Sequence, residues 1–334
     1  MRNIFLLMVL LAMAPIAFAQ SHTAPAPLYR DPLYDGAADA TVVYNAGLKE
    51  WWMFYTQRRA NQETADVAYC YGTAIGVAVS KDHGQTWVYK GALNLAFEEG
   101  MNTFWAPDLV FENGVYHLFV AYIRGVRNHW GGSATITRYT STDMWNWKHE
   151  GDLALSSASV IDPCFMKLAD GKWHIWYKDQ MKGSVTMTGA STDLKQWTIE
   201  KEPAIGGNPH EGPKVFFFKG SYWMITDEWA GQRLYKSADA KSWEKQGRLL
   251  DGVGKRNDDT PQGAHADVVV TGDKAYIFYF THPGRKKHTD AGELDGNGNY
   301  PYAMRRSSIQ VAELVLRNGT LTALRDEPFD FWLP

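Results

Sequence analysis

Cysteine is almost absent from this sequence, which has only Cys70 and Cys164 among its 334 residues. A disulfide-stabilised scaffold needs several pairs, so this chain must be stabilised by burying a hydrophobic core. No Cys/His grouping has the spacing of a zinc cluster. We expect the two cysteines to be buried thiols, and a single bridge between them is the alternative.

Long apolar segments and an excess of charge of one sign are also missing from most of the chain. After residue 18 there is no stretch of about 18 uninterrupted apolar residues, so no membrane-spanning helix is expected. The formal net charge is −3, with both signs mixed throughout, which argues against nucleic acid as a partner. We expect a monomer with no nucleic-acid or membrane partner.

The one long apolar run lies at the N-terminus and is typical of a secretory signal peptide. Arg2 supplies a positive charge, residues 4–18 are almost wholly apolar, and Ala17-Phe18-Ala19 forms a small-x-small pattern. Such a segment is removed from the mature protein; an ordinary buried helix is the alternative. We therefore predict a signal peptide at residues 1–19, a secreted or periplasmic location, and one domain over residues 20–334.

What the sequence has in abundance is aromatic residues, with 14 Trp, 17 Tyr and 15 Phe, and these fill β-sheet cores. Many of them fall in a repeated pattern, in which a glycine precedes alternating aromatic and aliphatic residues. Each copy is typical of the second strand of a β-hairpin with the glycine in the turn. The copies are Gly47–Tyr55, Gly114–Tyr122, Gly171–Tyr177, Gly220–Ile225 and Gly272–Tyr279.

A second repeat follows the first four hairpins and consists of Ser-x-Asp with a tryptophan four or five residues later. Its copies are Ser80/Asp82/Trp87, Ser141/Asp143/Trp147, Ser191/Asp193/Trp197 and Ser237/Asp239/Trp243. A Ser/Asp turn followed by a large ring is a recurring way to close a propeller blade. Five hairpins without amphipathic helices between them predict an all-β, five-bladed β-propeller. We expect the strand Ile309–Leu316 to close the last blade.

A titratable residue precedes each of the five hairpin glycines by six to nine positions. These residues are Asp39, Asp108, Asp162, Glu211 and His265. The innermost strand of each propeller blade lines the central channel, so equivalent positions should converge on one site. Crowded carboxylates can raise one another's pKa values, and glycoside hydrolysis requires one ionised and one protonated carboxyl group. The alternative is that the aspartates only cap turns.

Short motifs around these residues resemble those of glycoside hydrolase family 43, the five-bladed propellers of arabinanases, arabinofuranosidases and β-xylosidases. The motifs occur in the family's order, blade by blade, over the mature chain. They are Trp105-Ala106-Pro107-Asp108, Ile161-Asp162-Pro163, Glu211-Gly212-Pro213 and Gly263-Ala264-His265. The resemblance implies an inverting glycosidase acting on an oligosaccharide from a plant or algal polysaccharide.

The resemblance also implies a role for several residues. Asp39 would be the general base that activates water, Glu211 the general acid, and Asp162 would orient the acid and adjust its pKa. His265 matches a histidine that holds a calcium ion in the channel of several family members, although no cofactor is required. Asp108, His265 and His210, which precedes Glu211, are expected to contact substrate.

Two departures from the family pattern leave alternatives open. The first-blade motif is usually Asp-Pro, but here it is Asp39-Ala40, so Asp31-Pro32 is a competing candidate for the base. The segment Tyr55–Asn61 is similar to the family 117 anhydrogalactosidases, propellers that act on red-algal galactans and are thought to use a histidine acid. His210 keeps that variant open.

Arginines cluster after the hairpin strands, where loops overhang one face. They are Arg58, Arg59, Arg124, Arg127 and Arg285. They are either solvated loop charges or a cationic rim that binds uronate or sulfate groups. Arg285 resembles the family's fifth-blade arginine near the reactive sugar, and Arg58 is a second candidate for substrate binding.

Three tryptophans, Trp105, Trp130 and Trp229, are candidate platforms for sugar rings, with core packing as the alternative. The pair Asp227-Glu228 is a weaker candidate for a second set of acids. Long loops at residues 57–72 and 286–300 would close the channel into a pocket, which favours exo action. The competing functions are a glycan-binding propeller without catalysis and, less favoured, a polysaccharide lyase.

Overall fold

The computed structural model describes residues 22–334 and contains five four-stranded antiparallel sheets. In chain order the sheets are β1 (Ala37–Asn45), β2 (Glu50–Gln57), β3 (Ala74–Ser80) and β4 (Val88–Ala92); β5 (Thr103–Glu112), β6 (Val115–Ile123), β7 (Thr135–Ser141) and β8 (Lys148–Asp152); β9 (Val160–Lys167), β10 (Trp173–Asp179), β11 (Val185–Ser191) and β12 (Thr198–Ile199); β13 (Glu211–Phe218), β14 (Ser221–Asp227), β15 (Gln232–Ser237) and β16 (Glu244–Leu249); and β17 (Ala264–Thr271), β18 (Lys274–Thr281), β19 (Ser308–Arg317) and β20 (Thr320–Leu324). The only helical segments in this range are η1 (Val67–Cys70) and α1 (Tyr302–Arg305).

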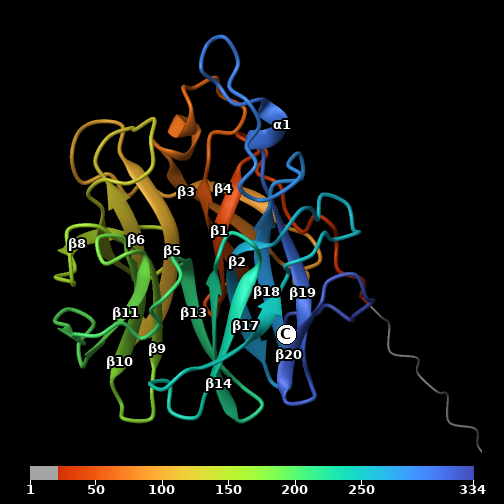
Figure 1. Cartoon of the computed structure of the whole chain (residues 1–334). Coiled ribbons are helices and arrows are strands. Elements are labelled where there is room, and N and C mark those ends of the chain that lie inside the picture. Colours follow the sequence, from red (N-terminus) through yellow and green to blue (C-terminus); the bar gives the residue numbers. More distant parts are fainter. Residues whose placement is uncertain (1–21) are drawn as a thin grey trace, which may run out of the picture.

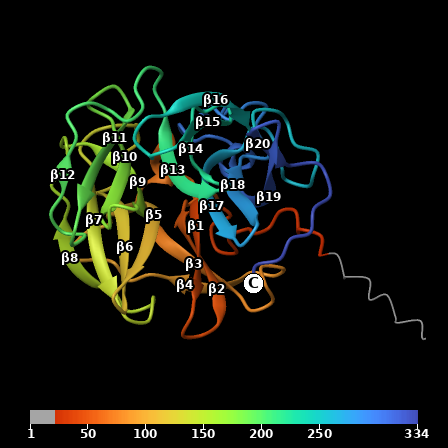
Figure 2. The same cartoon turned by 90° about the horizontal axis from the view of Figure 1, so that it is seen from below.

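The sheets are arranged around a central axis as the five blades of a propeller (Figure 2). The first strand of each blade is innermost, and β1, β5, β9, β13 and β17 contact their neighbours in a closed ring. The tight turns of the first hairpins lie at one end of the channel and the longer loops at the other (Figure 1). The fold predicted from the two repeats is therefore confirmed.

Both repeats have the structural roles expected of them. The five repeated glycines precede the second strand of each blade, and Ser80, Ser141, Ser191 and Ser237 end the third. In each of these four turns the serine Oγ donates to the aspartate two residues later at 2.9–3.0 Å. The strand Ile309–Leu316, however, is the third strand of the last blade rather than its closing strand, because β20 pairs outside it.

Large rings between and within the blades form the core. Trp52, Trp176 and Trp223, from the second strands of blades 1, 3 and 4, are each no more than 1 % exposed. Cys70 and Cys164 are buried free thiols, so the prediction of two thiols is confirmed and the bridge is wrong. No helix between residues 22 and 334 is long and apolar enough to cross a membrane. The predicted signal peptide lies outside the described residues.

A β-bulge interrupts every innermost strand near the loop end of the channel. The register shifts lie at 38–41, 105–108, 161–164, 211–214 and 264–266. In the first four blades the bulge contains a residue with positive φ, namely Asp39, Ala106, Asp162 and Gly212. Proline follows three of these residues, which is compatible with a bulge because its missing N–H removes no ladder hydrogen bond there.

The ring is joined by segments that cross between the last blade and the first. Tyr29 pairs with Ile309 of β19, and Gly36 pairs with Ser307. The segment after β20 crosses to blade 1, where the backbone N–H of Leu333 donates to the His83 carbonyl at 2.9 Å. These contacts stabilise the seam because blades 1 and 5 share no strand.

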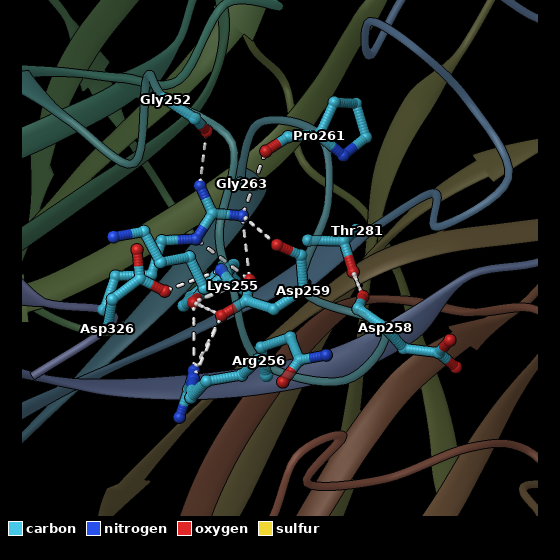
Figure 3. A network of polar contacts seen from close by, with 12 residues as sticks. Gly252, Lys255, Arg256, Asp258, Asp259, Pro261, Gly263, Thr281 and Asp326 are labelled. Atoms are coloured by element: carbon cyan, nitrogen blue, oxygen red, sulfur yellow. Dashed lines mark hydrogen bonds and ion pairs between the residues drawn. The ribbon is translucent and has the colours of Figure 1, made fainter. Parts of the chain in front are cut away.

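A buried ionic network attaches the loop before β17 to the end of the last blade (Figure 3). Asp259 is fully buried and accepts hydrogen bonds from Arg325 at 2.8 and 3.0 Å, from Arg256 at 2.9 and 3.1 Å and from Tyr279. Arg325 also donates to the carbonyls of Gly252 and Pro261 at 2.6 and 3.0 Å. One carboxylate therefore holds together three parts of blade 5.

We predict that Asp259→Asn lowers the free energy of unfolding by about 3–5 kcal/mol, because it leaves a buried guanidinium without its countercharge. Urea denaturation followed by tryptophan fluorescence would measure this loss. Arg317→Gln removes one partner of the exposed Arg317–Glu327 pair and should leave the midpoint unchanged. Equal effects of the two substitutions would contradict the structural role of Asp259.

Candidate active site

A cavity of about 930 Å³ opens at the loop end of the channel. Asp39, Asp162 and Glu211 all line it, although they come from blades 1, 3 and 4. The convergence depends on the bulges, since Asp39 and Asp162 are the positive-φ residues of their bulges and Glu211 directly precedes Gly212 in its own. Aspartate tolerates this backbone conformation better than most residues.

Asp39 is the blade 1 carboxylate of the cavity, and its partners are two basic side chains. Arg58 Nη2 donates to both carboxylate oxygens at 3.2 Å, and His265 Nδ1 lies 3.5 Å from Oδ1. The φ of Asp39 is 50° and that of Asp162 is 56°, so Ala40 gives the same bulge as the usual proline. The competing candidate, Asp31, is buried outside the cavity, where it accepts hydrogen bonds from Tyr55 and Gln57.

Glu211 forms an ion pair that the sequence did not suggest. Lys178, the penultimate residue of β10, donates from Nζ to Glu211 Oε2 at 2.9 Å and lies over the Trp229 ring at 5.2 Å. Burial alone would raise the pKa of Glu211, but the Lys178 ammonium outweighs it and lowers that pKa to about 2. Glu211 is therefore ionised in the free protein, contrary to the expectation that crowding raises the pKa of the acid.

Two neighbouring carboxyl groups have raised pKa values instead. Burial raises the pKa of Asp162 to about 6 and that of Asp227 to about 7, and the negative charge of Glu211 contributes to both shifts. Asp162 Oδ2 accepts the backbone N–H of Gly212 at 3.1 Å. Asp162 is thereby connected to the strand that carries Glu211.

Asp227 is a fully buried residue that does not line the cavity but positions two residues that do. Its carboxylate accepts the backbone N–H groups of Trp229 and His265, each at 2.7 Å. Trp229 has a φ of 57°, which is rare for so bulky a side chain and requires support from its surroundings. Glu228 lies apart from the cavity and is paired with Arg233 and Arg248, so the Asp227-Glu228 pair does not act as two adjacent acids.

His265 lines the cavity beside the carboxylate of Asp39. Burial lowers its pKa, and the charges of Asp162, Asp39 and Glu211 outweigh that effect and raise it. Within residues 22–334 no group of three or more His, Cys, Asp or Glu side chains is arranged to hold a metal ion. The calcium ion that the sequence resemblance implied at His265 stays a prediction.

Two residues expected to contact substrate do not face the cavity. Asp108 is two positions beyond its bulge residue, and Asp39 and Asp162 are bulge residues themselves. Asp108 consequently lies one layer below the cavity residues, where it pairs with Lys214 at 3.1 Å. Lys214 also contacts Asp267 at 2.7 Å. His210 is 1 % exposed and its ring contacts Thr186 Oγ1 and the Asn208 carbonyl.

The predicted cationic rim is only partly assembled. Arg58, Arg127 and Arg285 line the cavity, whereas Arg59 and Arg124 do not. Arg59 donates to backbone carbonyls of Tyr71 and Ala68, and Arg124 pairs with Glu98 on the surface.

Aromatic side chains form one wall of the cavity. Trp105 contacts Tyr71 and Trp130, with ring centroids 4.8 and 6.2 Å away, and its Nε1 donates to the Cys70 carbonyl. Trp130 is 59 % exposed, so its ring is free to stack on a sugar. Trp229 lines the cavity as well.

The two long loops are connected to each other across the cavity rim. The backbone N–H of Asp66 donates to the Gly298 carbonyl at 2.7 Å, and Asp66 and Asn299 form a parallel bridge. Arg285 Nη2 donates to Tyr69 Oη at 2.9 Å. The loops therefore close one side of the channel, which is the arrangement that the exo hypothesis requires.

Sequence reasoning missed Lys178, His282 and His288, all of which line the cavity. Lys178 stands near the end of a second strand, in the region where the arginines were sought. Searching strand ends for any cation, rather than for arginine alone, would have found it. The two histidines lie in a long loop with no repeat to mark them.

A sequence model of the family described as Glycosyl hydrolases family 43 matches residues 94–300 of the chain. This match spans more than half of the sequence and contains two of the three cavity carboxylates. The chain belongs to glycoside hydrolase family 43. Among curated protein sequences none matches it.

Solved structures of family 43 enzymes share the fold of this family 43 glycosidase at low sequence identity. One, from Xanthomonas citri in complex with xylose, has a TM-score of 0.62 and 16 % identity over 93 % of this chain and 97 % of that one. A β-xylosidase/α-arabinofuranosidase from a compost metagenome, in complex with xylotriose and calcium-free, has a TM-score of 0.61 and 15 % identity over 90 % and 96 %. A β-1,3-galactosidase with galactodeoxynojirimycin has a TM-score of 0.60 and 14 % identity over 86 % and 93 %.

We predict that Lys178→Met shifts the pH dependence of this family 43 enzyme. The ammonium is the main influence that lowers the pKa of Glu211, so this pKa rises when it is removed. A general acid works while protonated, so the alkaline limb of the kcat/KM profile should move to higher pH. Lys178→Arg keeps the charge and is the matched control. An alkaline limb that stays in place in Lys178→Met would show that Lys178 does not control this group.

Proposed function

We propose that the chain is an inverting, exo-acting glycosidase in which Asp39 is the general base and Glu211 the general acid. The observation that carries the proposal is the convergence of Asp39, Asp162 and Glu211 on one cavity from three blades. Inverting hydrolysis needs two carboxyl groups on opposite sides of the sugar, separated by about 6.5–9.5 Å to leave room for water.

In the proposed reaction Asp39 removes a proton from a water molecule, which attacks the anomeric carbon from the face opposite the leaving group. Arg58 and His265 contact the Asp39 carboxylate and hold it in position for this step. Glu211 gives a proton to the leaving oxygen. Since Glu211 is ionised in the free protein, it must first take up that proton from water as the substrate binds.

Substrate binding favours protonation of Glu211, and one oxygen of this carboxyl group stays available for the leaving group. A sugar ring that fills the cavity excludes water, and desolvation favours the protonated carboxyl group. The hydrogen bond from Lys178 occupies Oε2 of Glu211, which leaves Oε1 for the leaving oxygen. The proposed steps use protein side chains and no metal ion.

The substrate we propose is an oligosaccharide from a plant or algal polysaccharide, hydrolysed from its end. The connected loops at residues 57–72 and 286–300 support attack at a chain end. We further propose that residues 1–19 direct export, so that the enzyme acts outside the cytoplasm as a monomer.

The decisive experiment is hydrolysis of a panel of aryl glycosides, followed by proton NMR of the first product formed. We expect the anomeric configuration of the initial product to be opposite to that of the substrate. A product with retained configuration would exclude the roles assigned to Asp39 and Glu211. A second measurement, the appearance of single sugars before longer fragments from an oligosaccharide, would support exo action.

A further inference from the structure

One wall of the cavity is cationic and has no catalytic carboxylate paired with it. We define the histidine–arginine wall as His282, Arg285 and His288, which follow β18 and all line the cavity. The wall is near the reaction centre, because the charges of Glu211 and Asp39 both act on His288. A group bound there would belong to the sugar being cleaved.

Arg285 differs in its partners from Lys178 and Arg58. Lys178 is paired with Glu211 and Arg58 with Asp39. Arg285 donates instead to three neutral oxygens, the carbonyls of Met304 and His288 at 2.7 and 2.6 Å and Tyr69 Oη at 2.9 Å. A guanidinium has five N–H groups, so two remain for a ligand and the positive charge remains uncompensated.

The histidines carry unused ring nitrogens beside this charge. His288 is 8 % exposed, and within the described part of the chain its Nδ1 has no hydrogen-bond partner. His282 Nδ1 donates to the Arg306 carbonyl at 2.9 Å, which leaves its Nε2 as an acceptor, and the two rings lie 5.5 Å apart. Burial and the neighbouring Arg285 lower the pKa of both histidines, so both rings are neutral and can bind without adding charge.

We propose that the histidine–arginine wall binds an oxyanion substituent of the sugar, so that the enzyme acts on an acidic glycan. The two free N–H groups of Arg285 and a ring nitrogen of His288 would donate to the oxyanion, and His282 would accept from a neighbouring hydroxyl. Charge-assisted bonds of this kind are shorter and stronger than neutral ones. A carboxylate at C6 of a uronic acid and a sulfate ester share this chemistry. The inference rests on the proposed function, because the bound group is taken to be part of the sugar substrate. Binding of that sugar can be measured without turnover.

The test is binding of monosaccharide pairs to the Glu211→Gln variant, measured by calorimetry. The pairs are galacturonate with galactose and glucuronate with glucose, and galactose 6-sulfate separates the two sources of the oxyanion. We expect at least one acidic sugar to bind about tenfold or more tightly than its neutral partner. That preference should disappear when Arg285→Gln is added. Equal or tighter binding of the neutral sugars would overturn the inference.

Because Arg285 also holds its own loop, a second variant is needed. His288→Phe keeps a ring that packs beside His282 and removes the donor, and it should reduce the preference several-fold while circular dichroism shows an unchanged fold. Arg124→Gln removes a positive charge outside the cavity and should keep the full preference. A preference that survives both Arg285→Gln and His288→Phe would place the anion elsewhere and overturn the inference.

The inference and the proposed function can fail separately. If the wild type hydrolyses neutral aryl glycosides and shows no preference for acidic sugars, the inference is wrong and the proposed function stands. If acidic sugars bind selectively but the wild type hydrolyses no glycoside, the wall is supported and the proposed function is wrong.

Discussion

Glu211→Gln should lower kcat/KM by about 10²–10⁴ on glycosides whose leaving group is another sugar. A sugar alkoxide is a poor leaving group and needs the proton that Glu211 supplies. The loss should be much smaller on nitrophenyl glycosides, because nitrophenolate departs without protonation. The measurement is kcat/KM on a series of aryl glycosides of increasing leaving-group pKa, together with one natural oligosaccharide.

Two comparisons make this result specific. The amide of the variant still accepts a hydrogen bond from Lys178, so the cavity should keep its shape and its affinity for sugar. Glu200→Gln, an exposed residue outside the cavity, should retain wild-type rates on every substrate. Equal losses on activated and natural glycosides would show that Glu211 is not the general acid.

Asp39→Asn should lower kcat/KM by a similar factor of about 10²–10⁴ on every substrate, including nitrophenyl glycosides. Activation of water is needed whatever the leaving group, so a better leaving group should not restore the rate. The variant also leaves Arg58 without the carboxylate that it contacts through Nη2. Initial rates on the same aryl glycoside series would reveal a flat dependence on leaving-group pKa.

Asp31→Asn is the informative comparison, because Asp31 was the competing candidate and the structure places it among Tyr55 and Gln57, outside the cavity. Its folded fraction should turn over substrate at the wild-type rate. If Asp31→Asn removed activity while Asp39→Asn kept it, the assignment of the base would be reversed.

The sequence alone determined the architecture of this family 43 enzyme and most of its catalytic candidates. A blade is a local structure of about 50 residues, so its turn glycines and Ser-x-Asp turns recur at regular intervals and can be counted. Residues that precede the same hairpin must lie around the same axis. Asp39, Asp162 and Glu211 were predicted in this way, and the cavity contains all three.

Only the tertiary structure decided which residues of a strand face the cavity and which partners they have. One bulged residue changes the register, so Asp108, two positions beyond its bulge residue, joins Lys214 one layer below. The pair between Lys178 and Glu211 joins residues on neighbouring blades, 33 positions apart in the chain, and no local pattern encodes it. The same contact reverses the expected shift of the Glu211 pKa, because the nearby Lys178 ammonium lowers this pKa by more than burial raises it.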